Sequence, residues 1–170
     1  GIDWMSLANN HIKDYGTDGI ADTRKNMDRY GIKYSGAGKD LAQARDYSIL
    51  TVKGVRIAII PCTAIAPSIF ATPSSGGGMP CKNRYIVPDI REAKTKADFV
   101  IVFPHWGVEY SRSPQIYQQN WANKWRKAGA DLVLGAHSHV AGAIEEIDGM
   151  PVFYSMGNFI FDQNWRTETM

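Results

Sequence analysis

Short apolar runs alternate with segments of helical spacing along most of the chain. The run 98–103 is apolar after its first residue and 132–134 is a second such run, which is typical of strands buried in a parallel sheet. Helices are expected at four places: 18–30, 39–46, 88–97 and 114–128. Strands that alternate with helices predict an α/β fold, with a mainly parallel sheet covered on both faces.

Caps and turns mark the ends of these elements. Thr17 and Ser113 are expected to cap the first and last helices, because a hydroxyl can accept from the free amides of a helix start. Lys-Gly and Asp-Gly pairs are typical of tight hairpin turns. Two hairpins are therefore expected: 47–52 with 55–60 around Lys53-Gly54, and 143–147 with 152–155 around Asp148-Gly149.

The segment 61–84 is predicted to be a long loop. It has no apolar period, and five of the eight residues at positions 73–80 are proline or glycine. Long loops in compact domains are often functional, so it is either a lid or substrate-contacting segment or a tolerated insertion. Cys62 and Cys81 lie within it, and they fit a disulfide in an oxidising compartment as well as two free thiols.

Composition does not decide the function. The chain has 170 residues, of which 44% are hydrophobic and 21% charged, and its net charge of +2 gives no reason to expect nucleic acid or an anionic membrane as partner. No apolar run is long enough to cross a bilayer. The chain begins without Met and enters a predicted strand at 3–7 almost at once. We therefore expect it to be part of a longer protein, in which any signal or anchor would lie.

All four histidines follow predicted strands, and this shared position is the strongest signal in the sequence. They are His11, His105, His137 and His139. Ligands of open α/β sheets bind beyond the carboxyl ends of the strands, so these rings are expected to meet there. His137 and His139 would point to the same side of an extended segment. Neutral imidazole suits manganese, iron or zinc, which predicts a divalent-metal site.

Asn10 and His11 are expected to differ in role. The amide oxygen of Asn10 can ligate a hard metal, although Asn is also a common turn residue. His11, which points the opposite way, could act as a general acid toward a leaving-group oxygen. Asp14 could orient His11 as a hydrogen-bonded carboxylate, or bond to backbone instead.

Three further polar residues lie near the histidines. Glu109 could hold His105 or contact substrate, and Asn158 with Asp162 follows the last predicted strand. Each of them could equally be a loop residue that bonds to backbone.

At these residues the sequence resembles the poly-γ-glutamate capsule-synthesis proteins of the CapA type, a branch of the calcineurin-like metallophosphoesterase superfamily. The stretches that carry the resemblance are Ser6-Leu-Ala-Asn-Asn-His11 with Asp14-Tyr-Gly16, Gly36-Ala-Gly38, His105-Trp-Gly-Val-Glu-Tyr110, 128–135 with His137 and His139, and Phe153-Tyr-Ser-Met-Gly-Asn-Phe-Ile-Phe-Asp162. Together they span nearly the whole chain. The resemblance implies a four-layered αββα sandwich with a two-metal centre at one edge.

The resemblance also implies roles for these residues. Asn10 looks like a metal-ligating Asn, His11 like the catalytic proton donor, and His105 and His137 like ligands of the second metal. His139 looks like a ligand of the first. The ions would be manganese, iron or zinc.

Some positions depart from the superfamily pattern. Asn9 stands where a Gly usually precedes the Asn-His pair, and the acidic partner comes three residues later, as Asp14. The first two metal motifs should precede that pair, where only nine residues stand, and Asp3 fits neither motif. We therefore expect residues 1–170 to be the C-terminal portion of one such domain, N-terminally truncated and unable to build a full dinuclear centre alone.

The resemblance predicts a role in bacterial capsule biosynthesis at the cell surface, with a metal-dependent hydrolase site. A metal-bound hydroxide would attack a phosphoester or carbonyl centre while His11 protonates the leaving group, with low activity in this chain. The alternative is a non-catalytic protein that binds or exports an anionic glutamate polymer. A metal-free α/β domain is a third possibility. A sheet without all its partners exposes apolar surface, so a homo-oligomer is also expected.

Overall fold

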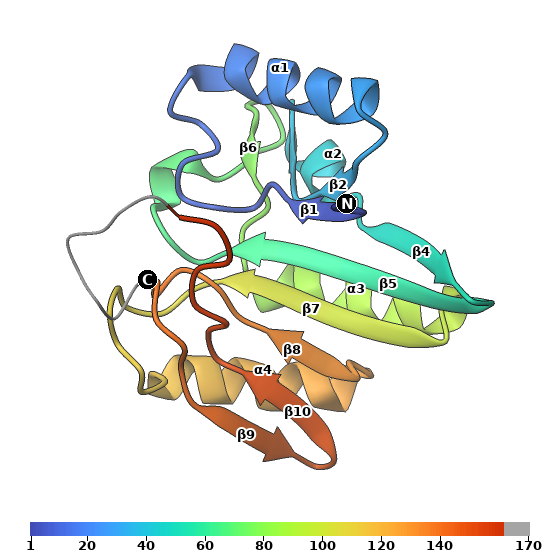
Figure 1. Ribbon diagram of the computed structural model, residues 1–170, viewed down its shortest axis with the longest axis vertical. Coiled ribbons are helices and arrows are strands. Elements are labelled where there is room, and N and C mark those ends of the chain that lie inside the picture. Colours follow the sequence, from blue (N-terminus) through green and yellow to red (C-terminus); the bar gives the residue numbers. More distant parts are fainter. Residues whose placement is uncertain (162–170) are drawn as a thin grey trace.

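The apolar strands form a six-stranded sheet at the centre of the structure (Figure 1). The computed structural model describes residues 1–161. From one edge to the other, the strands are β4 (Ser48–Val52), β5 (Val55–Thr63), β7 (Phe99–His105), β8 (Leu132–Leu134), β10 (Met150–Phe153) and β9 (Ile144–Ile147). The four inner strands are parallel, and each edge strand is the antiparallel arm of a hairpin. The predicted mainly parallel sheet and both hairpins are thereby confirmed.

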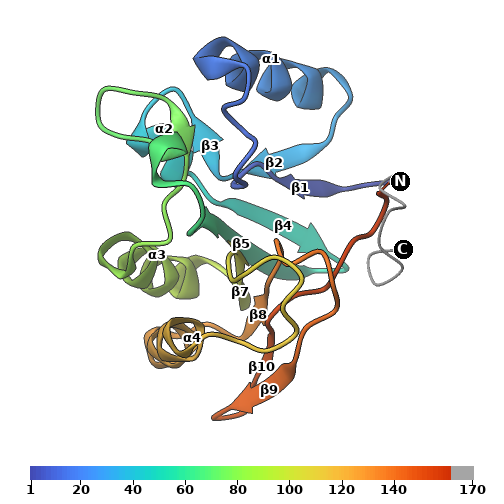
Figure 2. The same cartoon turned by 90° about the vertical axis from the view of Figure 1, so that its left-hand side faces the viewer.

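Helices α3 (Asn83–Lys96) and α4 (Ile116–Ala128) pack on the same face of this sheet (Figure 2). On β7, alternate residues such as Val100 and Val102 turn toward the helices and are fully buried. The residues between them face the other way, and Phe99 there is 37% exposed. The prediction that both faces are covered therefore holds only in part for the described residues: Trp4 packs against Phe103 on the second face, while Phe99 at the start of β7 stays exposed.

The N-terminal part of the chain builds a smaller layer beside the main sheet (Figures 1 and 2). Its elements are β1 (Trp4–Ser6), α1 (Gly16–Arg29), β2 (Lys33–Ser35), β3 (Ala37–Gly38), α2 (Leu41–Arg45) and, from later in the chain, η1 (Pro67–Ile69) and β6 (Gly77–Gly78). β1 pairs with β2 and β3 with β6. Trp4 connects the layers, because its Nε1 donates to Ser48 Oγ at 2.9 Å and its ring meets Phe103 edge-on.

Both predicted helix caps are wrong. α1 begins at Gly16, after Tyr15, so Thr17 lies inside the helix. α4 begins at Ile116 rather than at Pro114, because Gln115 and Gln118 form a reciprocal capping box that satisfies two amides at once. In the part of the chain that the structure describes, no helix combines the length and apolarity that crossing a bilayer requires.

The segment 61–84 is folded rather than an open loop. β5 continues through Thr63, and the glycines of β6 pair with β3. Backbone packs so closely there that a Cβ on Gly77 would lie 2.2 Å from the carbonyl oxygen of Ile69. Pairing through glycines leaves no apolar period in the sequence, which is why this structure was not predicted and why a mobile lid does not describe the segment.

The two cysteines form a disulfide, Cys62–Cys81, and both are buried. It joins the end of β5 to the residues just before α3, across a sequence separation of 19. Of the two alternatives left open by the sequence, the structure has the disulfide.

We expect the disulfide to stabilise the fold by limiting the unfolded chain. A closed loop of this length corresponds to about 3 kcal/mol. Urea unfolding of a Cys62→Ser/Cys81→Ser variant should therefore show a free energy of unfolding lower by roughly that amount. The wild-type chain kept in reductant is the control for the substitutions, and unchanged stability in both samples would contradict the prediction.

Candidate metal centre

Three segments that are far apart in the sequence bring polar side-chain atoms to one place. Asn10 follows β1, His105 ends β7, and His137 follows β8. The Nε2 of His105 lies 2.8 Å from the Oδ1 of Asn10 and 3.2 Å from the Nδ1 of His137. The two imidazole rings are 4.8 Å apart between centroids. We call these three residues the histidine pocket.

Backbone pairing beyond the end of β8 places His137 next to His105. The amide of Ala136 donates to the carbonyl of Pro104 at 2.9 Å, and the amide of Trp106 donates to the carbonyl of Ala136 at 3.0 Å. His105 itself is the last residue of β7, two residues beyond the predicted end of that strand. Directly after Ala136 the chain turns, with a φ of 105° at His137.

A stack of three aromatic side chains packs behind the turn at His137. The Trp106 side chain is fully buried, and it stacks on Trp125 and Tyr154 at centroid distances of 5.2 and 6.0 Å. Its Nε1 donates to the carbonyl of Tyr154 at 2.9 Å. A Cβ on Gly135 would lie 2.1 Å from that same carbonyl oxygen, so only glycine fits there. No sequence pattern indicated this role of Trp106, although the residue stands directly beside His105.

Burial keeps the pocket histidines neutral. It lowers the pKa of His105 to about 3, and the positive charges of the other histidines act in the same direction. Burial also lowers the pKa of His137, while the carboxylate of Glu109 opposes this shift. Neutral imidazole is the form that binds a metal ion, so both rings are ready to act as ligands near neutral pH.

The donor atoms fit one side of a coordination sphere. Two ligands at right angles on one ion, each about 2.1 Å from it, lie about 3 Å apart, which is close to the two separations in the pocket. The set consists of two imidazoles and one amide and lacks a carboxylate. Among residues 1–161 there is no group of three or more His, Cys, Asp or Glu side chains that could hold an ion.

His139 lies beside the histidine pocket rather than in it. The expected extended His-x-His segment is wrong, because φ is positive at both His137 and His139 and the backbone bends between them. Their ring centroids are 6.4 Å apart. The Nδ1 of His139 donates to the Oδ1 of Asn158 at 2.9 Å, and its ring packs near Phe161. Asn158 thus positions His139.

His11 and Asp14 form an exposed pair at the edge of the pocket. The Nδ1 of His11 lies 2.8 Å from the Oδ2 of Asp14, and the side chains are 74% and 52% exposed. The predicted partnership is therefore present in the structure. Glu109 acts on His137 through its charge instead of bonding to His105. Asp162 lies outside the described residues.

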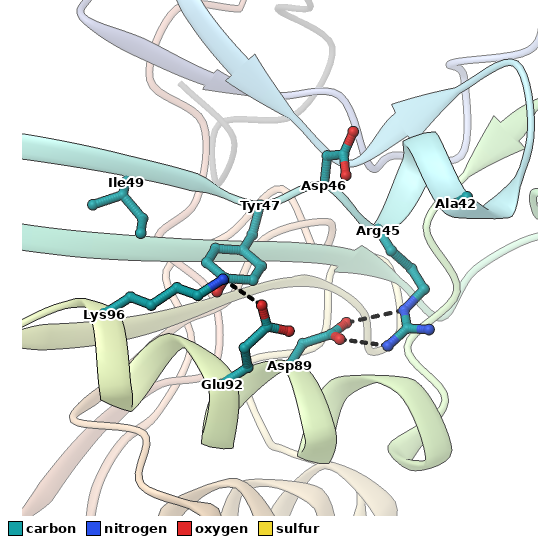
Figure 3. Close-up of a pocket in the computed structure, with 8 residues that line it drawn as sticks. All are labelled: Ala42, Arg45, Asp46, Tyr47, Ile49, Asp89, Glu92 and Lys96. Atoms are coloured by element: carbon teal, nitrogen blue, oxygen red, sulfur yellow. Dashed lines mark hydrogen bonds and ion pairs between the residues drawn. The ribbon is translucent and has the colours of Figure 1, made fainter.

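Away from the histidine pocket, a hollow lined by charged side chains, with a volume of about 560 Å³, lies between α2, β4 and α3 (Figure 3). Both cations in its wall are paired with carboxylates: Arg45 donates to the buried carboxylate of Asp89, and Lys96 to Glu92. Burial raises the pKa of Asp89, and the bond from Arg45 opposes the rise. Because both cations are already paired and Asp46 adds a further carboxylate, the hollow is no candidate for binding an anionic substrate.

Solved structures with a similar fold include nucleotidases. A 5'-nucleotidase precursor from Thermus thermophilus aligns with a TM-score of 0.58 at 18% identity, covering 91% of this chain and 32% of its own. The NAD nucleotidase of Haemophilus influenzae gives the same TM-score and identity, covering 91% and 33%. The calcineurin-like phosphoesterase fold class predicted from the resemblance is thereby confirmed.

Sequence comparisons identify the family. The PGA biosynthesis protein CapA of Bacillus subtilis is 39% identical over 163 residues, and the capsule biosynthesis protein CapA of Bacillus anthracis is 35% identical over 170 residues. The alignments cover 95% and 97% of this chain but 43% and 41% of the relatives, so the chain spans less than half of their length. A family model described as bacterial capsule synthesis protein PGA_cap matches residues 1–163. The chain belongs to this family of bacterial capsule synthesis proteins.

Proposed function

We propose that this chain acts in the synthesis of a bacterial poly-γ-glutamate capsule, and that its histidine pocket is where a divalent cation meets an anionic group of the substrate. The observation that carries the proposal is the convergence of Asn10, His105 and His137 from three distant segments. Membership of the capsule family and the phosphoesterase fold supply the biological setting.

The pocket would hold manganese, iron or zinc through the Asn10 Oδ1, the His105 Nε2 and the His137 Nδ1. When bound, the ion supplies a Lewis acid for a phosphoryl or carbonyl oxygen. His105 contributes by staying neutral, and its ligating tautomer carries the proton on Nδ1. His139, which Asn158 holds close by, would meet a second ion or the substrate.

We expect His11 to donate a proton. The carboxylate of Asp14 accepts a hydrogen bond from the Nδ1 of His11, which would hold the ring and leave its Nε2 free to face a leaving-group oxygen. The exposure of both side chains leaves room for a large substrate. Glu109 stands near enough to influence His137, so it would orient that ring or a bound group.

A non-catalytic role in binding or exporting the glutamate polymer is the second candidate. The observation that favours it is the donor set, which has no carboxylate. In this case polymer binding would survive a chelator and tolerate the loss of His137 and His139. Binding that disappears under either treatment would exclude this second candidate.

The disulfide bears on the location of the protein, and the exposed part of the second sheet face, which we call the open face, bears on its self-association. Buried disulfides persist in oxidising compartments, so Cys62–Cys81 favours an extracytoplasmic location. The open face, which includes Phe99, offers apolar surface to a second copy of the chain. We propose that isolated chains form homo-oligomers through this face.

Self-association should depend on the open face. We expect light scattering to show a mass that rises with protein concentration, and a Phe99→Lys variant to reduce that rise because the charge opposes burial of the face. A Tyr30→Lys variant, altered at an exposed aromatic on the small layer, is the control. A clean monomer at high concentration would exclude the homo-oligomer.

Hydrolysis should be slow and should depend on His11. With manganese and a generic phosphodiester, we expect a low turnover that falls by a further 10²-fold or so in His11→Ala, which is the lower range for losing a general acid. Asp14→Asn should cause a smaller loss, because the amide oxygen of Asn can still accept from the Nδ1 of His11 and so keep the imidazole in place. Manganese affinity should weaken in His105→Ala but not in His11→Ala. Activity that is unchanged in His11→Ala would contradict its role as proton donor.

The metal-free chain should lose stability as the pH falls through the titration range of His105. Its pKa is about 3 in the folded chain, against 6.5 for the unfolded group. Between these values the unfolded chain binds more protons, so stability drops on acidification, by at most about 1.4 kcal/mol per pH unit for this group. Urea unfolding at pH 7, 6 and 5 should show a shallower slope for His105→Gln than for the wild type. Parallel slopes would contradict a neutral, buried His105.

A further inference from the structure

A groove with a volume of about 520 Å³ opens at the carboxyl end of β5. Its walls come from the end of β5 and the next residue, from Phe70 just after η1, from the start of α3 with the two residues before it, and from α4. Two aromatic side chains, Phe70 and Trp121, line it together with Lys82 and Arg84. It therefore combines an apolar wall with two positive charges.

These two cations have no carboxylate partner among residues 1–161, and no carboxylate lines the groove. The Nζ of Lys82 lies 5.8 Å from the centre of the Phe70 ring, and the Arg84 guanidinium lies 4.8 Å from the Tyr85 ring. Aromatic faces hold the cations in place without using their hydrogen-bond donors. The hollow in Figure 3 differs, because its cations are already bonded to carboxylates.

Two contacts hold the backbone around Lys82 and Arg84 in place. The Oδ1 of Asn83 accepts from the Nε1 of Trp125 at 2.8 Å, which ties the first residue of α3 to α4. The disulfide holds Cys81 against the end of β5. Lys82 and Arg84 stand on either side of Asn83, so their backbone is held in place, and both residues are exposed to solvent.

The groove and the histidine pocket are neighbours in the fold. Thr63 and Ala64 line the groove, and Thr63 pairs with His105 in the register of β5 and β7. The amide of Ala64 donates to the carbonyl of His105 at 2.9 Å. A flexible chain of several units that lies in the groove would therefore extend over the adjoining strand ends to the pocket.

We propose that this groove binds a run of carboxylates on a glutamate polymer, while another unit of the same chain lies at the histidine pocket. This inference rests on the proposed function and adds the place where the polymer is held. Lys82 and Arg84 pair with successive carboxylates, and Phe70 and Trp121 contact the methylene groups between them. Regularly spaced charges with apolar spacers match the polymer better than they match a single small anion.

The test measures binding of fluorescent poly-γ-glutamate to the whole chain in the presence of a chelator. We expect Lys82→Gln/Arg84→Gln to weaken binding about tenfold and to make it less sensitive to salt, because two ion pairs are lost. The matched control is Lys25→Gln/Arg29→Gln on α1, which removes the same charge and also has an arginine over an aromatic ring, Tyr30. The control should change binding less than twofold. Equal thermal unfolding of both variants checks that they fold.

Three outcomes would overturn the proposal that the groove binds the polymer. They are an unchanged affinity in the groove variant, an equal loss of affinity in the groove and control variants, and binding of a single-stranded oligonucleotide as tight as that of the polymer. None of these outcomes depends on the metal, which manganese affinity in His105→Ala tests separately. If the chain binds metal normally and the groove variant has no effect, the groove proposal is excluded while the metal centre stands. A clear groove effect in a chain that binds no metal would exclude the metal centre alone.

Discussion

The site depends on backbone pairing that continues past the end of a strand. β8 is only three residues long, yet Ala136 still bonds to the backbone on both sides of His105. This pairing brings two imidazoles from positions 32 residues apart into contact. Asn10 completes the pocket from the N-terminal layer, so the position of that layer against the main sheet matters as much as the sheet itself.

The chemistry of the pocket follows from what lies under it. The stack of Trp106, Trp125 and Tyr154 fills the space behind the strand ends and excludes water from it. Burial then disfavours the charged imidazolium and leaves lone pairs for a cation. In contrast, the side chain of His11 is largely exposed and is hydrogen-bonded to Asp14. One small region thus provides two kinds of histidine.

The sequence predicted the sheet, its hairpins and the meeting of His105 with His137, because apolar runs and turn residues are local signals. Three features could not be predicted from these signals. The glycines of β6 pair through backbone alone, which leaves no side-chain pattern to detect. Apolar residues on both faces of β7 indicated that both faces of the sheet are covered. The apolar pattern does not show which part of the chain covers the face that includes Phe99. The bend at His139 is likewise set by tertiary contacts, since the sequence there contains no glycine.

The left-handed backbone at His137 and His139 has a consequence for how the site responds to ligands. Side chains with a Cβ adopt this conformation at a cost of about 1 kcal/mol or more each, which the surrounding structure must outweigh. The rings are therefore set when the chain folds, and an arriving ion would find them in position without further ordering. Glycine at either position would relax the backbone but remove an imidazole, so a gain in backbone stability there would cost the pocket one of its rings.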